Sequence, residues 1–199
     1  MATAIRKGDM MRRRRYTALA AVAAAAAVSA ALPATAQAEE RVCRGSIGPR
    51  TLDNVRVPSG ATCRLTRTYV KGTIRVQRGA TLVANRVRVV GNVQAEGARN
   101  VVVRRSSRVG GSVQVKQGRR ATVLGSRVNG DIQYDANRGL LVASANRVGG
   151  SIQVVGNRGG ARIYRNVVIG NLQCKENSPR PRGGGNRVGG SKEDQCRRF

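Results

Sequence analysis

Arginine is the residue type that could do chemistry in this sequence, because it recurs every 19 or 20 residues in two series. The first series is Arg88, Arg108, Arg127, Arg147 and Arg187, with Val167 where the spacing calls for one more, and the second is Arg99, Arg119, Arg138 and Arg158. A guanidinium group is a planar fork that can bind two oxygens of one phosphate or carboxylate. These nine arginines are therefore the candidate anion-binding residues.

The spacing of the arginines follows a repeat that fills most of the chain. A Gly-x-x-Gln motif, with Val, Ile or Leu in third place, opens at Gly91, Gly111, Gly130, Gly150 and Gly170. Residues 54–63 match residues 73–82 at a shift of 19, so two earlier coils open at Asp53 and Gly72. Self-similarity at a short, fixed period is typical of a solenoid. We count about seven coils of 19–20 residues and a broken eighth that opens at Gly190.

Each coil has the two-residue side-chain period of a β-strand. Aliphatic residues stand two positions after each opening, at Val55, Ile74, Val93, Val113, Ile132, Ile152 and Leu172. The next position points outward and holds Arg56, Arg75, Gln94, Gln114, Gln133, Gln153 and Gln173. This pattern predicts an all-β fold, a single-stranded parallel β-helix (solenoid) over residues 53–174, and the coil length favours a right-handed one. Stacked glutamines would add amide-to-amide hydrogen bonds between coils.

Stacking of the coils would bring the arginines of each series close together. Coils lie about 4.8 Å apart in such a fold, so neighbouring guanidinium groups would repel each other by about 0.9 kcal/mol in water before screening. An anionic polymer lying along a series would relieve this repulsion. Candidates are teichoic-acid-like phosphate polymers, nucleic acid, anionic lipid headgroups and acidic polysaccharide. The alternative is a solvated basic surface that the repeat has copied from coil to coil.

The net charge favours binding to anions without identifying one. The formal charge is +27, and residues 1–38 hold six basic residues and one acid, so +22 remains for residues 39–199. Such a charge predicts attraction to polyanions and a strong dependence on salt. Stacking of nucleic-acid bases needs exposed aromatic residues. The aromatic residues after residue 38 are few, and Tyr134 stands in an inward column; the others are Tyr69, Tyr164 and Phe199. We therefore expect contacts with nucleic acid to be nonspecific.

Residues 1–38 are typical of a secretory signal peptide. Four arginines at residues 12–15 precede an alanine-rich apolar run over residues 18–32, and Ala36-Gln37-Ala38 offers small residues for cleavage before Glu39. A retained membrane anchor is the alternative, and the small-residue exit favours cleavage, after which we expect no transmembrane span. The arginines leave both the general secretory and the twin-arginine routes open. The protein is predicted to be secreted or associated with a bacterial cell envelope.

The four cysteines all follow the leader and indicate an oxidising compartment. Cys43 is within reach of Cys63 in the first coil, and Cys174 stands one coil before Cys196, whereas other pairings would span the rod. We predict the disulfides Cys43–Cys63 and Cys174–Cys196. They would hold an N-terminal cap at residues 39–52 and a C-terminal cap at residues 175–199, where Lys192 replaces the inward aliphatic residue.

Residues suited to catalysis are sparse. The sequence has no histidine, and no lysine follows its glycine pairs as in a P-loop. Asp131 and Asp135 are the closest outward acids within one coil, yet four extended residues place them about 13 Å apart, beyond the ~5–9.5 Å between glycosidase carboxylates. We therefore predict no catalytic residue, no metal site and no cofactor.

Two segments near the ends of the repeat also carry a resemblance. Val-Pro-Ser-Gly-Ala-Thr-Cys at residues 57–63, together with residues 170–196, which run from Gly-Asn-Leu-Gln-Cys to Lys-Glu-Asp-Gln-Cys, resembles secreted repeat proteins of high-GC actinobacteria. The resemblance covers nearly all of the chain after the leader. It implies a right-handed parallel β-helix and export but no site, because that family has no established activity. The glycine-aliphatic spacing is similar, in a generic way, to the polymerising bactofilin scaffold.

The sequence as a whole predicts an exported, non-enzymatic protein of the cell envelope or extracellular space. Its arginines would contact an anionic wall or extracellular polymer, and we expect a monomer. A hydrolase or lyase acting on polysaccharide is the alternative on the same scaffold. End-to-end polymerisation is a third possibility, and the two caps speak against it because they would cover the open strand edges.

Overall fold

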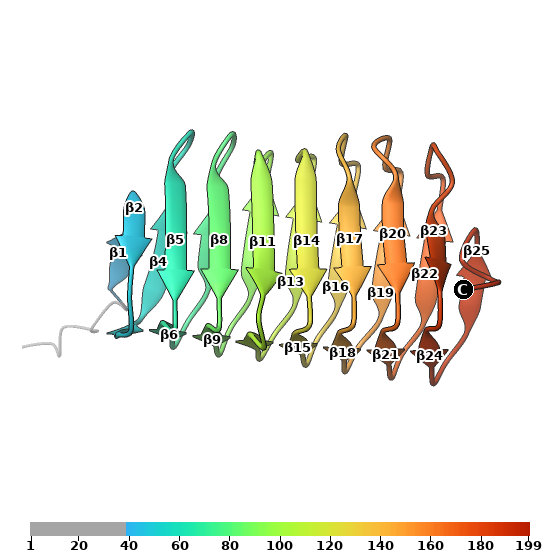
Figure 1. Ribbon diagram of the computed structural model, residues 1–199. Coiled ribbons are helices and arrows are strands. Elements are labelled where there is room, and N and C mark those ends of the chain that lie inside the picture. The colour runs from blue at the N-terminus through green and yellow to red at the C-terminus, as the bar shows by residue number, and fades with distance from the viewer. Residues whose placement is uncertain (1–38) are drawn as a thin grey trace, which may run out of the picture. The chain divides into compact units, whose positions relative to one another are not determined.

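The structure is a computed structural model that describes residues 39–199, and these residues form a β-solenoid without any helix (Figure 1). The predicted signal peptide, residues 1–38, lies outside the described residues. Within residues 39–199 no helix could cross a membrane.

Three parallel sheets make up the solenoid, and each turn gives one strand to each sheet. Sheet A contains β1 (Glu40–Val42), β4 (Asn54–Val57), β7 (Ile74–Val76), β10 (Val93–Glu96), β13 (Val113–Lys116), β16 (Ile132–Asp135), β19 (Ile152–Val155), β22 (Leu172–Lys175) and β25 (Lys192–Asp194). Sheet B contains β2 (Gly45–Ile47), β5 (Thr62–Thr66), β8 (Thr81–Asn85), β11 (Asn100–Arg104), β14 (Arg120–Leu124), β17 (Leu141–Ser144), β20 (Ala161–Tyr164) and β23 (Arg182–Gly184). Sheet C contains β3 (Thr51–Leu52), β6 (Tyr69–Val70), β9 (Arg88–Val89), β12 (Arg108–Val109), β15 (Arg127–Val128), β18 (Arg147–Val148), β21 (Val167–Val168) and β24 (Arg187–Val188).

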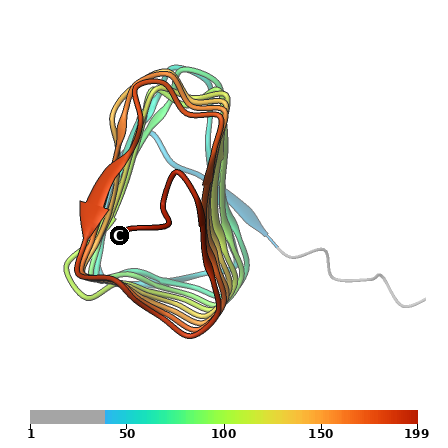
Figure 2. The ribbon, with the colours of Figure 1, turned by 90° about the vertical axis from the view of Figure 1, so that its right-hand side faces the viewer.

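The predicted parallel β-helix is confirmed, and it is right-handed. Strands of sheet B run downward on the near side of Figure 1 while the chain advances from left to right, and the three sheets enclose a three-sided cross-section (Figure 2). Successive turns pair in register, as Val93 does with Ile74 on one side and Val113 on the other.

The solenoid is longer than the predicted range 53–174. β1, β2 and β3 of the expected N-terminal cap pair with β4, β5 and β6, and β23, β24 and β25 extend each sheet at the other end. Eight complete turns and one further strand result, in place of about seven coils. The reason is that backbone pairing does not require the inward aliphatic pattern from which the prediction was made.

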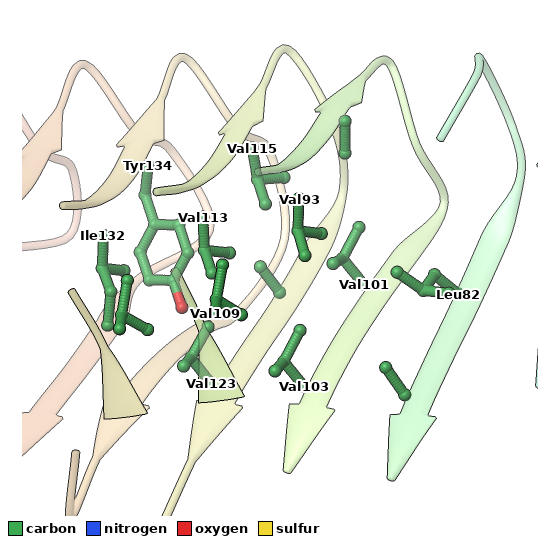
Figure 3. Packing of buried hydrophobic residues seen from close by; sticks show 14 of the residues in the cluster. Leu82, Val93, Val101, Val103, Val109, Val113, Val115, Val123, Ile132 and Tyr134 are labelled. Carbon is green, nitrogen blue, oxygen red and sulfur yellow. The ribbon is translucent and has the colours of Figure 1, made fainter. Parts of the chain in front are cut away.

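The interior is a continuous stack of aliphatic side chains, most of them fully buried (Figure 3). Val93, Val113 and Ile132 form one inward column of sheet A, and each such side chain stabilises the fold by about 1.5–3 kcal/mol through burial. Tyr134 is the largest buried residue, and its hydroxyl donates a hydrogen bond to the Val142 carbonyl oxygen at 2.8 Å. Burial raises the pKa of this phenol.

Buried asparagines join the turns at two corners in the C-terminal half. Their Nδ2 atoms donate to the Oδ1 of the next asparagine at 2.9–3.0 Å, along Asn137–Asn157–Asn177 at the corner between sheets A and B and along Asn146–Asn166–Asn186 at the corner between sheets B and C. Each of these six Nδ2 atoms also donates to a backbone carbonyl of the adjacent strand in the preceding turn, such as that of Val115 or Val123. Within residues 39–199 no buried side-chain nitrogen or oxygen lacks a partner.

The predicted hydrogen bonds between stacked glutamines are not formed. The glutamines do stack in register on sheet A, but within residues 39–199 no glutamine bonds to another glutamine of that column. Their outward position exposes the amides to water, whereas the buried asparagines bond to one another, to the backbone and, in the last turn, to Gln195. The inter-turn amide ladders therefore lie at the corners.

The two predicted disulfides are confirmed, one at each end. Cα atoms lie 5.5 Å apart in Cys43–Cys63 and 5.2 Å apart in Cys174–Cys196. At the C-terminal end the last residues fold across the opening of the solenoid (Figure 2), and Phe199 packs against the core. Gln195 continues one asparagine ladder, because its Oε1 accepts hydrogen bonds from the backbone and side-chain nitrogens of Asn177 at 3.0 Å.

Candidate anion-binding face

The first arginine series lies side by side on sheet C. Arg88 pairs with Arg108, Arg108 with Arg127, and Arg127 with Arg147, while Val167 separates Arg147 from Arg187. The strands here are only two residues long, so each contributes one inward valine and one exposed arginine. Arginines that are 19 or 20 residues apart in the sequence therefore lie next to one another as a row of exposed cations.

Two shallow hollows follow this row. One of about 330 Å³ is lined by Arg88, Val89, Val90, Arg108, Val109, Gly110, Arg127 and Asn129. The next, of about 220 Å³, is lined by Arg127, Val128, Asn129, Arg147, Val148, Gly149, Val167 and Ile169. Glycine is required at position 110 because a Cβ there would collide with the Val90 carbonyl oxygen. A polymer segment could therefore lie beside the row of arginines.

The second series lies at the corner between sheets A and B. The backbone N–H groups of Arg119, Arg138 and Arg158 donate to the carbonyls of Ala98, Gly118 and Asn137, the residues that precede the arginine of the turn before. Arg99, Arg119, Arg138 and Arg158 therefore stack turn upon turn, and all four are exposed. They border sheet B on the side opposite sheet C.

A third arginine series was missed in the sequence. Arg67, Arg86, Arg105 and Arg165 stand at the corner between sheets B and C, each exposed and each with a positive φ of 54–60°. Gly125, Ala145 and Gly185 hold the same place in the other turns, and Ser106 adds an extra residue in one. These interruptions break the regular spacing, although the Arg-x-Arg pair at residues 86–88 was a usable signal.

Acidic residues are confined to one sheet. All nine acids after residue 38 lie in a strand of sheet A or directly beside one: Glu39, Glu40, Asp53, Glu96, Asp131, Asp135, Glu176, Glu193 and Asp194. Three of the four lysines after residue 38 follow the same rule, because Lys116, Lys175 and Lys192 lie in sheet A. Lys71 directly follows β6 of sheet C and pairs with Asp53 at 3.2 Å. We call sheets B and C, with the corners between A and B and between B and C, the basic face. Its charged residues are arginines, apart from Glu176 at the corner between A and B.

The middle of sheet B differs from its edges. Its outward column in the central turns consists of Val83, Val102, Thr122 and Val142, all partly exposed. Arginine series lie at both neighbouring corners. A ligand on this sheet would meet methyl groups in the centre and guanidinium groups on either side.

The predicted anion-binding arginines have no anionic partner within residues 39–199. Ion pairs in this part of the chain join Arg56 to Glu40, Lys71 to Asp53 and Lys175 to Glu176, all of them using acids of sheet A or its borders. None of the nine predicted residues takes part. Their charges are available to an external anion.

The carboxylate of Asp131 has a structural partner. Its Oδ1 accepts a hydrogen bond from the backbone N–H of Ser151 at 2.7 Å, in a column where Asn92, Ser112 and Asn171 accept the same bond from the turn that follows. Asp131 therefore belongs to a third inter-turn ladder, whereas Asp135 is exposed. In the part of the chain that the structure describes, no three His, Cys, Asp or Glu residues could together hold a metal ion.

Comparison with known proteins identifies no relative: no protein-family model, curated protein or solved structure matches this chain. The similarity to secreted actinobacterial repeat proteins therefore stays a prediction. The fold and the arrangement of charges are the basis on which a function can be argued.

Proposed function

We propose that the protein is an exported, non-enzymatic binding protein that holds anionic polymers on its basic face. The observation that carries this proposal is the segregation of charge: the acids and three of the four lysines after residue 38 lie on or beside sheet A, and the basic face bears arginine with Glu176 as its one other charged residue within residues 39–199. A genome-wide preference for arginine would replace lysine on every face. Here lysine is used on sheet A, so the choice of arginine depends on position.

The arrangement suits a polymer better than a small anion. Rows of arginine run along the solenoid axis over several turns, and neighbouring charges in a row are about one strand spacing, or 4.8 Å, apart at their bases. This distance is shorter than the ~8 Å Debye length at physiological ionic strength, so salt does not fully remove the repulsion. A polyanion along the row neutralises several of these charges at once.

The compartment proposed for this activity is extracellular or in the cell envelope. Both disulfides close the ends of the solenoid, and disulfides are typical of proteins in an oxidising environment. Export through a signal peptide at residues 1–38 agrees with this environment and with the resemblance to secreted actinobacterial repeat proteins. The polymers that the protein would meet there include wall phosphate polymers and acidic polysaccharides.

The test is binding to purified cell wall and to naked DNA, each across a salt series. We expect retention on wall material beyond that on DNA, with a steep loss as salt rises. The variant R108Q/R127Q/R147Q should lose this retention, while R41Q/R56Q/R75Q, which removes the same charge from three consecutive turns of sheet A, should keep most of it. Equal losses in both variants, or equal and fully salt-reversible binding to wall and DNA, would show that the charge acts without a preferred face or ligand.

A further inference from the structure

The corners on the two sides of sheet B both require a residue with a positive φ, but different residue types occupy these positions. At the corner between A and B, the positions with positive φ hold Gly97, Gln117, Ala136, Gly156 and Glu176. At the corner between B and C, four of these positions hold arginine, namely Arg67, Arg86, Arg105 and Arg165. The backbone therefore does not require arginine.

Arginine is a costly choice for a left-handed backbone conformation. Its Cβ approaches the following carbonyl oxygen when φ is positive, and glycine or asparagine would adopt the conformation more readily. Gly125 and Gly185 stand at this corner in other turns, which shows that glycine fits. Strained positions of this kind are concentrated at functional sites, where the side chain is needed for a purpose other than stability.

These arginines add a second row beside the row on sheet C. Arg86 and Arg88 stand on either side of buried Val87, and Arg105 and Arg108 stand on either side of Ser107 in the next turn. The hollow of about 330 Å³ borders the far side of Arg88 and Arg108. Each of these two turns therefore places two exposed arginines within three residues of each other.

Two side chains in this cluster are held in place by neighbours. The Arg88 guanidinium carbon lies 5.5 Å from the centre of the Tyr69 ring, and Arg104 Nε donates to Asn85 Oδ1 at 2.9 Å. Positioning of a side chain before binding reduces the entropy lost when a ligand binds. The cluster of Arg86, Arg88, Arg104, Arg105 and Arg108 thus has features of a prepared site.

We infer that this cluster is the primary binding site for a flexible, non-nucleic phosphodiester polymer such as a poly(glycerol phosphate). This inference rests on the proposed function and names its site and ligand class. A phosphodiester presents tetrahedral oxygens that guanidinium groups can approach from two sides, whereas the two oxygens of a carboxylate lie on one edge, which a single fork fills. Nucleic acid is disfavoured because Arg88 lies over one face of the Tyr69 ring, which reduces the aromatic surface in the cluster on which a base could stack.

The test compares two double variants of the full-length chain with equal loss of charge. R86N/R105N removes the arginines of positive φ from adjacent turns, and R119N/R138N removes two arginines from adjacent turns of the other corner. Affinity for poly(glycerol phosphate) at fixed salt should fall at least about tenfold in the first and less than about threefold in the second. The melting temperature of R86N/R105N should be no lower than that of the parent, because asparagine tolerates positive φ.

R86K/R105K separates charge from geometry, since lysine keeps the charge but lacks the planar fork. We expect a loss of affinity of at least about threefold for this variant. Equal losses in R86N/R105N and R119N/R138N, or tighter binding of single-stranded DNA or polyglutamate than of poly(glycerol phosphate), would overturn the inference while leaving polyanion binding in place. A parent chain that binds none of these polymers would overturn the proposed function as well.

Discussion

The two halves of the corner between sheets B and C follow the same backbone path, except for the inserted Ser106, but differ in chemistry. In the N-terminal half, Arg67, Arg86 and Arg105 take the positions of positive φ, and the buried positions that follow hold Thr68, Val87 and Ser107. In the C-terminal half, Gly125, Ala145 and Gly185 take most of the positions of positive φ, and the buried positions that follow hold Ser126 in the first turn and Asn146, Asn166 and Asn186 in the next three.

In this corner, the stabilising hydrogen bonds and most of the arginine charges therefore lie in different turns. The C-terminal half gains inter-turn amide hydrogen bonds and, apart from Arg165, avoids arginine at positive φ. The N-terminal half has the costly arginines and no amide ladder. The N-terminal half thus shows the fold without the asparagine ladder, and the C-terminal half shows it with few arginines at positive φ. Three sets of variants test this difference between the halves.

The largest effects should come from the disulfides at the two ends. Replacing Cys43 and Cys63 by alanine opens a crosslink over 20 residues, and replacing Cys174 and Cys196 opens one over 22, so the chain-entropy model predicts a loss of about 3 kcal/mol for each. The C-terminal end keeps the Asn177–Gln195 hydrogen bonds, whereas the first turn lacks such a ladder. Hydrogen exchange should therefore show fraying of β1–β3 in C43A/C63A and a still-docked β25 in C174A/C196A. If β25 frayed more in C174A/C196A than β1–β3 do in C43A/C63A, the predicted difference between the two ends would be wrong.

The next largest effect should come from the asparagine ladder. Asn166→Ala leaves the backbone and side-chain nitrogens of Asn146 without their acceptor and the Ala143 carbonyl without its donor, at a cost of about 2–3 kcal/mol. Ser107→Ala at the equivalent place removes one hydroxyl that serves the Val87 N–H and the Arg104 carbonyl, at a cost of about 1 kcal/mol. Urea denaturation measures both. Similar losses of unfolding free energy in the two variants would mean that the asparagine ladder stabilises the fold no more than a single hydroxyl does.

The smallest effect should come from extending the ladder by one turn. Ser126 N already donates to Asn146 Oδ1 at 3.0 Å, and the ladder asparagines of this corner donate to the carbonyl 23 residues earlier, which for position 126 is that of Val103. Ser126→Asn should therefore raise the free energy of unfolding by about 1 kcal/mol. Ser126→Ala, which removes the hydroxyl that bonds to the Leu124 carbonyl, is the matched control and should lower it. A destabilised Ser126→Asn variant would show that the ladder cannot be extended into the turn of Gly125.

Much of the fold could be predicted, because a two-residue side-chain period within a repeat of fixed length is typical of a β-solenoid. Val93 and Ile132 repeat at a fixed distance in sequence, and that regularity also determined the register of the arginines on sheet C. The outer turns could not be bounded in this way. Gly45–Ile47 and Lys192–Asp194 lack the inward aliphatic pattern and pair through backbone atoms, to which the Glu193 carboxylate adds hydrogen bonds from Asn171 and Gln173. Backbone atoms leave no pattern in the sequence.

The candidate site could be predicted only in part, for two physical reasons. Series with an unbroken period, such as Arg99 to Arg158, were visible, whereas the series containing Arg86 is interrupted by glycine, alanine and an inserted Ser106. The segregation of acids was hidden because it depends on which sheet each residue joins. Inter-turn hydrogen bonds were assigned to Gln114 and its equivalents, since the sequence does not tell an exposed amide from a buried one such as Asn157.

The most direct test of the central claim is residue-by-residue protection of arginine from a guanidinium-specific reagent when a polyanion is bound. With poly(glycerol phosphate) at low salt, we predict severalfold slower modification of Arg88, Arg108 and Arg127, reversed at high salt. Arg41 and Arg75, which are exposed on sheet A, should react at the rate of the free protein. Equal protection of Arg41 and Arg75 would contradict the account, because the polymer would then bind the whole surface and not the basic face.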